Sequence, residues 1–207
     1  MRLVPTLLAA FCAIVPAYAA PRCAAIAGSE RLWSMPGLRF VVVGEMHGTA
    51  ETPAIFADLV CSARRAKRPI VVGVERDFSE QDAIDAFLAP GNHEAALRAL
   101  LSEQGWHGRD GRSSRAMLAL LEQLRALKLR GLVSGVVAFS VAFDGSQSPS
   151  RGEERMPSAL AAAANPYPNA LVIALVGNVH ACKKPVAGLT SYRRWPRSCR
   201  PRKQCRC

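Results

Sequence analysis

Four runs of apolar, largely β-branched residues recur along the chain, and segments with helical spacing separate them. The runs cover 39–43, 70–74, 132–143 and 170–181, and the last one carries its polar residues at its end. The apolar part of each run is uniform rather than alternating, which is typical of strands buried on both faces of a parallel sheet. The sequence therefore predicts an α/β fold, with a mostly parallel sheet of about four or more strands and helices on both faces.

The intervening segments predict helices where apolar residues recur at intervals of three and four. Thr52 is expected to cap the first of these helices and Pro53 to lie in its first turn, while Glu51 suits the positive end of the helix dipole. The expected helices cover 52–63, 79–88, 93–102, 114–130 and 155–164. Loops are expected at 105–114 and 146–154, with a turn at 165–169.

Residues 1–20 have the pattern of a secretory signal peptide. A basic Arg2 precedes an apolar stretch at 7–15, and small residues at 17 and 19 fit an A-x-A cleavage site. The apolar stretch is too short to span a bilayer, and no later segment is apolar enough. We therefore expect a periplasmic or secreted protein with no membrane span after cleavage. Residues 21–185 then form a single domain, in which Cys23 and Cys61 are a plausible disulfide pair.

The basic charge is concentrated in the last 25 residues. The chain carries a net charge of +11, and 183–207 holds nine Lys or Arg with no acidic residue, so subtracting those nine charges leaves +2 for the rest. A nucleic-acid partner is therefore not expected. Segment 186–207 also holds three of the seven cysteines. It is open to three interpretations: a basic arm, a cysteine-stapled tail, or a disordered or out-of-frame end, which the abrupt change of composition favours.

Polar side chains follow each expected strand. Glu45 and His47 follow the first strand, Glu75 closes the second, Asp144 follows the third, and His180 ends the fourth. The carboxyl ends of parallel strands share one edge of a sheet, where ligands bind in open α/β folds. We therefore expect these side chains to converge, except Asp144, which is better explained as part of an Asp-Gly turn.

Two chemistries could use two histidines and two or more carboxylates. A His next to a carboxylate can act as a general base on water, because the carboxylate fixes its tautomer and stabilises the imidazolium. The same four side chains, Glu45, His47, Glu75 and His180, could instead bind a divalent metal that activates water. The residues alone leave both open.

The motifs GEMHGTAE, VGVERDF, RGEERM and VIALVGNVHA resemble the superfamily that joins erythromycin esterases, ChaN-like haem-binding proteins and the Tiki proteases. The resemblance spans 39–185 and is closest to the esterase branch. It implies a water-activating base at His47 with Glu75 as its acidic partner, and a role for His180 in polarising the ester or stabilising the oxyanion. Arg151 or Arg155 would hold an anionic or carbonyl group of a small-molecule substrate.

The resemblance predicts an exported hydrolase that activates water against an ester or related acyl bond. Its alternative is a ChaN-like periplasmic protein that binds haem or a metal without catalysis. The antibiotic esterases are longer and carry further helical segments that shape the substrate cleft, so a macrolide substrate is not expected.

Overall fold

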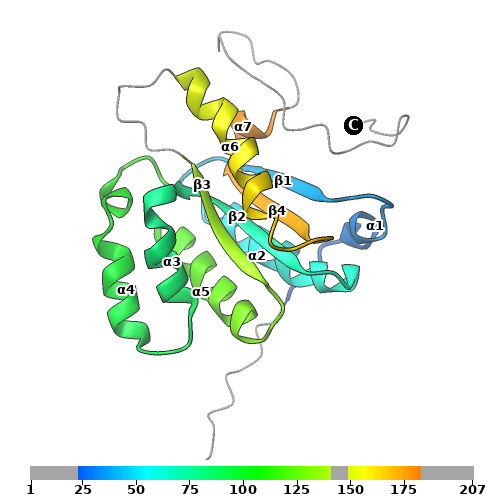
Figure 1. The fold of residues 1–207 in the computed structure, drawn as a ribbon, viewed down its shortest axis with the longest axis horizontal. Coiled ribbons are helices and arrows are strands. Elements are labelled where there is room, and N and C mark those ends of the chain that lie inside the picture. The colour runs from blue at the N-terminus through cyan, green and yellow to red at the C-terminus, as the bar shows by residue number, and fades with distance from the viewer. Residues whose placement is uncertain (1–22, 141–148, 183–207) are drawn as a thin grey trace, which may run out of the picture.

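Four parallel strands form a single sheet at the centre of the domain (Figure 1). The computed structural model describes residues 23–140 and 149–182, and for 149–154 it describes the backbone alone. The strands are β1 (Phe40–Glu45), β2 (Ile70–Asp77), β3 (Gly135–Ser140) and β4 (Leu171–Gly177). Their order in the sheet is β1-β4-β2-β3, and every pair is parallel. The predicted α/β class and the parallel sheet are confirmed.

The last strand in the chain occupies an inner position of the sheet. β4 pairs with β1 on one side, through Phe40 opposite Val172, and with β2 on the other, through Val71 opposite the same Val172. All seven residues of β4 are buried, as expected for a strand with neighbours on both edges and helices over both faces. β1 and β2 are therefore not adjacent, although only a helical connection separates them in sequence.

Helices cover both faces of the sheet. They are α1 (Ser29–Trp33), α2 (Glu51–Ser62), α3 (Gln81–Leu88), α4 (His93–Ser102), α5 (Arg115–Leu129), α6 (Pro149–Ala163) and α7 (Asn178–Ala181), with short 3-10 helices at Ala63–Ala66, Phe78–Glu80 and Gln104–His107. One buried cluster joins α2, α3 and α5 to side chains such as Val72 and Ile173. A second joins α6 to the opposite face through Leu160, Val172 and Phe139. None of the helices in the described ranges combines the length and apolar character that crossing a membrane requires.

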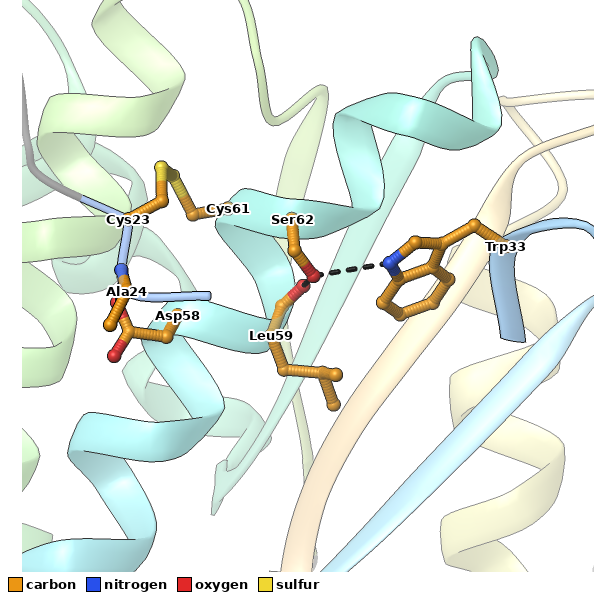
Figure 2. Close-up of a disulfide and its surroundings, with 7 residues drawn as sticks. All are labelled: Cys23, Ala24, Trp33, Asp58, Leu59, Cys61 and Ser62. Atoms are coloured by element: carbon orange, nitrogen blue, oxygen red, sulfur yellow. Dashed lines mark hydrogen bonds between the residues drawn. A yellow bond between two sulfur atoms is a disulfide. The ribbon is translucent and has the colours of Figure 1, made fainter. Parts of the chain in front are cut away.

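A disulfide ties the start of the domain to α2 (Figure 2). Cys23 and Cys61 are bonded across a sequence separation of 38, which confirms the predicted pair. In the chain-entropy model, a disulfide that closes a loop of this length lowers the conformational entropy of the unfolded chain and so stabilises the fold by about 4 kcal/mol. Close by, Nε1 of Trp33 donates to Oγ of Ser62 at 3.1 Å, so α1 is held against the end of the same helix.

The helices that begin with a side-chain cap start where the sequence predicts. Oγ of Ser114 accepts from the Met117 amide at the start of α5, and Oδ1 of Asn92 accepts from the Ala95 amide at the start of α4. The predicted cap at Thr52 is wrong, because α2 begins one residue earlier and Thr52 lies within its first turn. Glu51 is in that first turn, as its match to the helix dipole predicted.

Three further boundaries differ from the prediction. α6 begins at 149, so the expected loop 146–154 is helical from that point. The expected loop 105–114 contains the end of a 3-10 helix at Gln104–His107. The fourth strand ends at Gly177, and the following residues form α7 rather than a strand end. The signal peptide, Asp144 and the segment 186–207 lie outside the described residues, so those interpretations stay predictions.

Candidate functional site

The end of β1 places a carboxylate and an imidazole in direct contact. Glu45 is the last residue of β1 and is 3% exposed, and its Oε1 lies 2.7 Å from Nδ1 of His47. An ionised carboxylate only accepts hydrogen bonds, so in the neutral imidazole Nδ1 of His47 carries the proton and Nε2 keeps its lone pair. The resemblance gave this partnership to Glu75, whereas the hydrogen-bonded partner of His47 is Glu45.

Glu75 reaches the same edge from a bulge in β2. Val74 pairs with Ala138 and Asp77 with Ser140, so Glu75 and Arg76 together oppose a single residue of β3. Such a bulge turns side chains out of the regular alternation. Oε2 of Glu75 then accepts a 2.6 Å hydrogen bond from the amide of Gly177, which fixes the carboxylate against the end of β4.

Gly177 leaves the space that this arrangement needs. A Cβ at this position would lie 2.9 Å from Nε2 of His47 and 3.3 Å from Cδ2 of His180. Any larger residue would therefore displace one of the two imidazoles. The glycine is required here by close approach rather than by its backbone angles.

His180 enters the site from α7. This helix packs closely on β1, because a Cβ on Gly44 would lie 2.9 Å from both Cα of Asn178 and Cβ of Ala181. Nε2 of His180 lies 3.7 Å from Oε1 of Glu75. Sequence reasoning placed His180 at the correct edge but on a strand instead of a helix. The structure brings together all four predicted residues, Glu45, His47, Glu75 and His180.

An arginine that the sequence patterns did not single out, Arg112, lies at the centre of the site. Nη1 of Arg112 lies 3.3 Å from Oε1 of Glu75, the same oxygen that both imidazoles approach. Asp110 fixes the guanidinium by accepting from its Nε at 2.7 Å and lying 2.5 Å from its Nη2. Arg112 is thus an oriented cation with a side chain that is 34% exposed.

The loop that carries Arg112 rests on the turn after β1. Gly111 has a φ of +86° and Gly48 a φ of +87°, both in the left-handed region that favours glycine. A Cβ on Gly111 would overlap the backbone of His47 and Gly48. The only hint of this contact in the sequence is the Asp-Gly-Arg triplet itself, which reads as an ordinary exposed turn.

A buried ion pair supports the loop that carries Arg112. Arg76 donates from Nε and Nη2 to Oε2 of Glu80, at 2.8 and 2.5 Å, and stacks on the Trp106 ring at 4.4 Å from its centroid. Its Nη1 donates to the carbonyl oxygen of Arg112 at 2.9 Å. Arg76 and Glu80 are 3% and 2% exposed. Because the bulge places Arg76 beside Glu75, one distortion of β2 serves both the site and its supporting loop.

The arginines that the resemblance implied lie on α6. Arg155 is exposed in its second turn, and Arg151 precedes it by four residues, with a side chain outside the described part of the structure. The proposed binding role of either arginine therefore stays a prediction. Arg112 supplies a cation that contacts the site directly.

Neighbouring side chains of opposite charge shift the pKa of three residues at the site. The hydrogen bond to Glu45 raises the pKa of His47 above its ordinary value; burial of the ring opposes this, and the charge of Glu75 adds to it. Burial lowers the pKa of Arg112, but the hydrogen bond to Asp110 and the charge of Glu75 outweigh burial, so the net pKa is raised. Burial raises the pKa of Asp110, but its hydrogen bonds with Arg112 lower it below its usual range.

The sequence also predicts these four side chains as ligands of a divalent metal. Within 23–140 and 149–182, no three His, Cys, Asp or Glu side chains converge as metal ligands. Glu45 and His47 bond to each other, and the Nε2 atoms of His47 and His180 approach one carboxylate oxygen at 3.9 and 3.7 Å. Two ligands that each lie about 2.1 Å from one metal ion are themselves about 3.4 Å apart, so these distances do not exclude a metal, and the metal-binding alternative stays a prediction. The steps below use only the side chains of the described residues.

No protein-family model matches the chain, and no curated protein does either. Among solved structures, the C-terminal region of Pasteurella multocida toxin is 15% identical, with a TM-score of 0.45 over 73% of this chain and 21% of that one. The RRSP effector domain of a Vibrio vulnificus MARTX toxin is 17% identical, with a TM-score of 0.45 over 75% and 34%. The type III effector HopBA1 is 16% identical, with a TM-score of 0.41 over 66% and 65%. This chain thus spans about a fifth and a third of the first two, and similarity at this level establishes no shared site.

Proposed function

We propose that the protein is a hydrolase in which His47 activates a water molecule against an ester or related acyl bond of a small-molecule substrate. One observation carries the proposal. Nε2 of His47 and Nε2 of His180 lie 3.9 and 3.7 Å from Oε1 of Glu75, which is too far for direct hydrogen bonds. A water molecule that lies beside His47 and Glu75 and contacts both would meet a lone pair on His47 and an acceptor on Glu75.

The proton transfers follow from the hydrogen bonds already in place. Nε2 of His47 takes one proton from the water, and the hydroxide oxygen forms a bond to the acyl carbon. Glu45 stabilises the resulting imidazolium through the 2.7 Å bond to Nδ1. The imidazolium then returns the proton to the leaving alcohol as the acyl–oxygen bond breaks, which yields an acid and an alcohol. Glu75 orients the water by accepting a hydrogen bond from its other O–H group.

Two groups are placed to stabilise the negative oxygen that forms on the substrate. The Arg112 guanidinium is fixed by Asp110 and carries donors that Glu75 does not use. His180, on α7, approaches the same oxygen of Glu75, with its Nε2 at 3.7 Å. Fixed donors of this kind stabilise an oxyanion more than they stabilise the ground-state carbonyl. Arg112 is therefore the candidate for the role that the resemblance gave to Arg151 or Arg155.

His47→Ala tests the proposal against a panel of model esters of different acyl length. We expect hydrolysis to fall to the rate of the uncatalysed reaction, while His107→Ala, at an exposed histidine on the Gln104–His107 helix, retains the wild-type rate. Equal rates for wild type and His47→Ala would refute the assignment.

The same proposal includes export. The Cys23–Cys61 disulfide supports it, because disulfides persist in oxidising compartments. Mass spectrometry of the protein recovered from the periplasm should find that the first 19 or 20 residues have been removed. An intact N-terminus on cytoplasmic protein with a reduced Cys23 would contradict it.

The alternative, a haem-binding protein without catalysis, stays a prediction. It requires a Soret band on haem titration that His47→Ala or His180→Ala removes. The hydrolase proposal requires instead that haem leaves ester hydrolysis unchanged. The two measurements together separate the alternatives.

A further inference from the structure

A polar pocket lies at the edge of the sheet opposite the candidate site. It encloses about 460 Å³ and is lined by Gly37, Leu38, Arg39, Arg68, Asn165, Pro168 and Asn169. Arg39 directly precedes β1, Arg68 lies two residues before β2, and Asn169 lies two residues before β4. All strands are parallel, so this pocket is at their amino ends, whereas His47 and Glu75 are at their carboxyl ends.

Arg68 is built into the wall of this pocket. Its Nη1 donates to the carbonyl oxygen of Leu38 at 2.6 Å, its Nε to that of Asn169 at 2.7 Å, and its Nη2 to that of Ala170 at 3.1 Å. These bonds hold the segments before β1 and β4 together and fix the orientation of the guanidinium. They use only part of its donors and none of its charge, because a carbonyl oxygen is neutral.

Arg39 has a buried donor with no acceptor. Among the described residues, its Nε is buried and has no hydrogen-bond partner, while the guanidinium lies 5.5 Å from the centroid of the Phe40 ring. A buried donor without an acceptor is unfavourable, and because solvent does not reach this Nε, a ligand in the pocket would bind Arg39 through the terminal Nη donors. This distinguishes Arg39 from an arginine that is simply solvated at the surface.

The charge around the pocket has one sign. None of the described residues that line it is Asp or Glu. Arg64, Arg65 and Lys67 directly precede Arg68 and are exposed. Two guanidinium groups, one of them fixed, therefore share a pocket with two asparagine amides and with no carboxylate to neutralise them.

We propose that this pocket binds a phosphate-type oxyanion through Arg39 and Arg68. Arginine presents paired donors that match the oxygens of phosphate groups, and the neighbouring cations would draw an anion to this end of the molecule. The ligand is a phosphate group on a small molecule or on a lipid headgroup. The pocket is independent of the hydrolase site, since it shares no residue with it.

Calorimetric titration with inorganic phosphate and pyrophosphate, at constant ionic strength in chloride, tests the proposal. Arg39→Gln keeps a polar side chain but removes the charge, and it leaves the three bonds of Arg68 intact. We expect it to weaken phosphate binding about tenfold or more, the loss typical of a charge-assisted hydrogen bond. Arg65→Gln removes the same charge nearby without touching the pocket lining, so we expect a change of less than about twofold.

Co-sedimentation with vesicles separates the two sources. Binding to phosphatidylglycerol vesicles but not to phosphatidylcholine vesicles, lost in Arg39→Gln and competed by phosphate, would assign the site to a lipid headgroup. Phosphate binding without vesicle binding would assign it to a soluble ligand. No heat with phosphate and no vesicle binding, or equal binding by Arg39→Gln and wild type, would overturn the proposal. His47→Ala should bind phosphate like the wild type whether or not the hydrolase proposal holds.

Discussion

The clearest test of the candidate site is the replacement of Glu45 by Gln, read out as the pKa of His47. Glu45 is almost fully buried, and its Oε1 lies 2.7 Å from Nδ1 of His47. Gln has nearly the same shape, and its amide oxygen can still accept from Nδ1, so the tautomer is kept. What Gln removes is the negative charge that favours the imidazolium.

The size of the effect follows from the two kinds of hydrogen bond. A bond to a charged group contributes about 1.5–3 kcal/mol, and a neutral one about 0.5–1.5 kcal/mol. The difference is therefore about 1 to 1.5 kcal/mol, and a pKa unit corresponds to about 1.4 kcal/mol. We expect the pKa of His47 to fall by about one unit in Glu45→Gln, since the bond to Glu45 is the largest cause of its upward shift.

The assay is an NMR titration of the imidazole protons, which needs no substrate. The chain contains only four histidines, so single His variants assign the signals. Glu122→Gln is the matched control, because Glu122 Oε1 lies 3.0 Å from Nε2 of His93, a histidine outside the candidate site; it should leave the titration of His47 unchanged. An unchanged pKa of His47 in Glu45→Gln, with the fold intact by circular dichroism, would refute the assignment of Glu45 as its partner.

Arg112→Gln should lower kcat for ester hydrolysis about tenfold to a hundredfold, because one charge-assisted bond to the oxyanion is lost, whereas Arg109→Gln, at an exposed position in the same loop, should change it little. Glu80→Gln leaves Arg76 buried without its counter-ion and should lower the free energy of unfolding by about 3 kcal/mol or more; denaturant titration measures this. The exposed pair formed by Glu94 with Arg98 has the same i, i+4 spacing, so Glu94→Gln should cost less than about 0.5 kcal/mol. The kcat/KM of the wild type should rise with pH through the raised pKa of His47, because only the neutral imidazole accepts a proton; a rate that falls over that range would exclude His47 as the base.

Local patterns were sufficient to predict the sheet and the convergence of the site. Apolar runs such as 70–74 and 170–176 reflect burial on both faces, a property that each strand carries in its own residues. Once the strands are parallel, their carboxyl ends must share an edge, so the meeting of His47, Glu75 and His180 follows without any knowledge of strand order.

The features that sequence reasoning missed depend on contacts between distant segments. Arg112 meets Glu75 across 37 positions, and the contact depends on the left-handed Gly111 resting on the turn after β1. The bulge that aims Glu75 and Arg76 is a mismatch between β2 and β3, which neither strand carries alone. His180 was placed on a strand because its neighbours Val179 and Ala181 are apolar, but their positions in α7 are set by packing on β1.

The strand order keeps His47 and Glu75 out of direct contact, so that a water molecule can contact both side chains. His47 follows β1 and Glu75 belongs to β2, and β4 lies between these strands. Two strand spacings amount to about 10 Å, which the two side chains span from either side until 3.9 Å remain between Nε2 and Oε1. The intervening strand must also end without a side chain at this point, which Gly177 provides, while its amide holds Glu75 in place. The position of β4 between β1 and β2 thus separates the side chains of His47 and Glu75 and leaves both accessible to a water nucleophile.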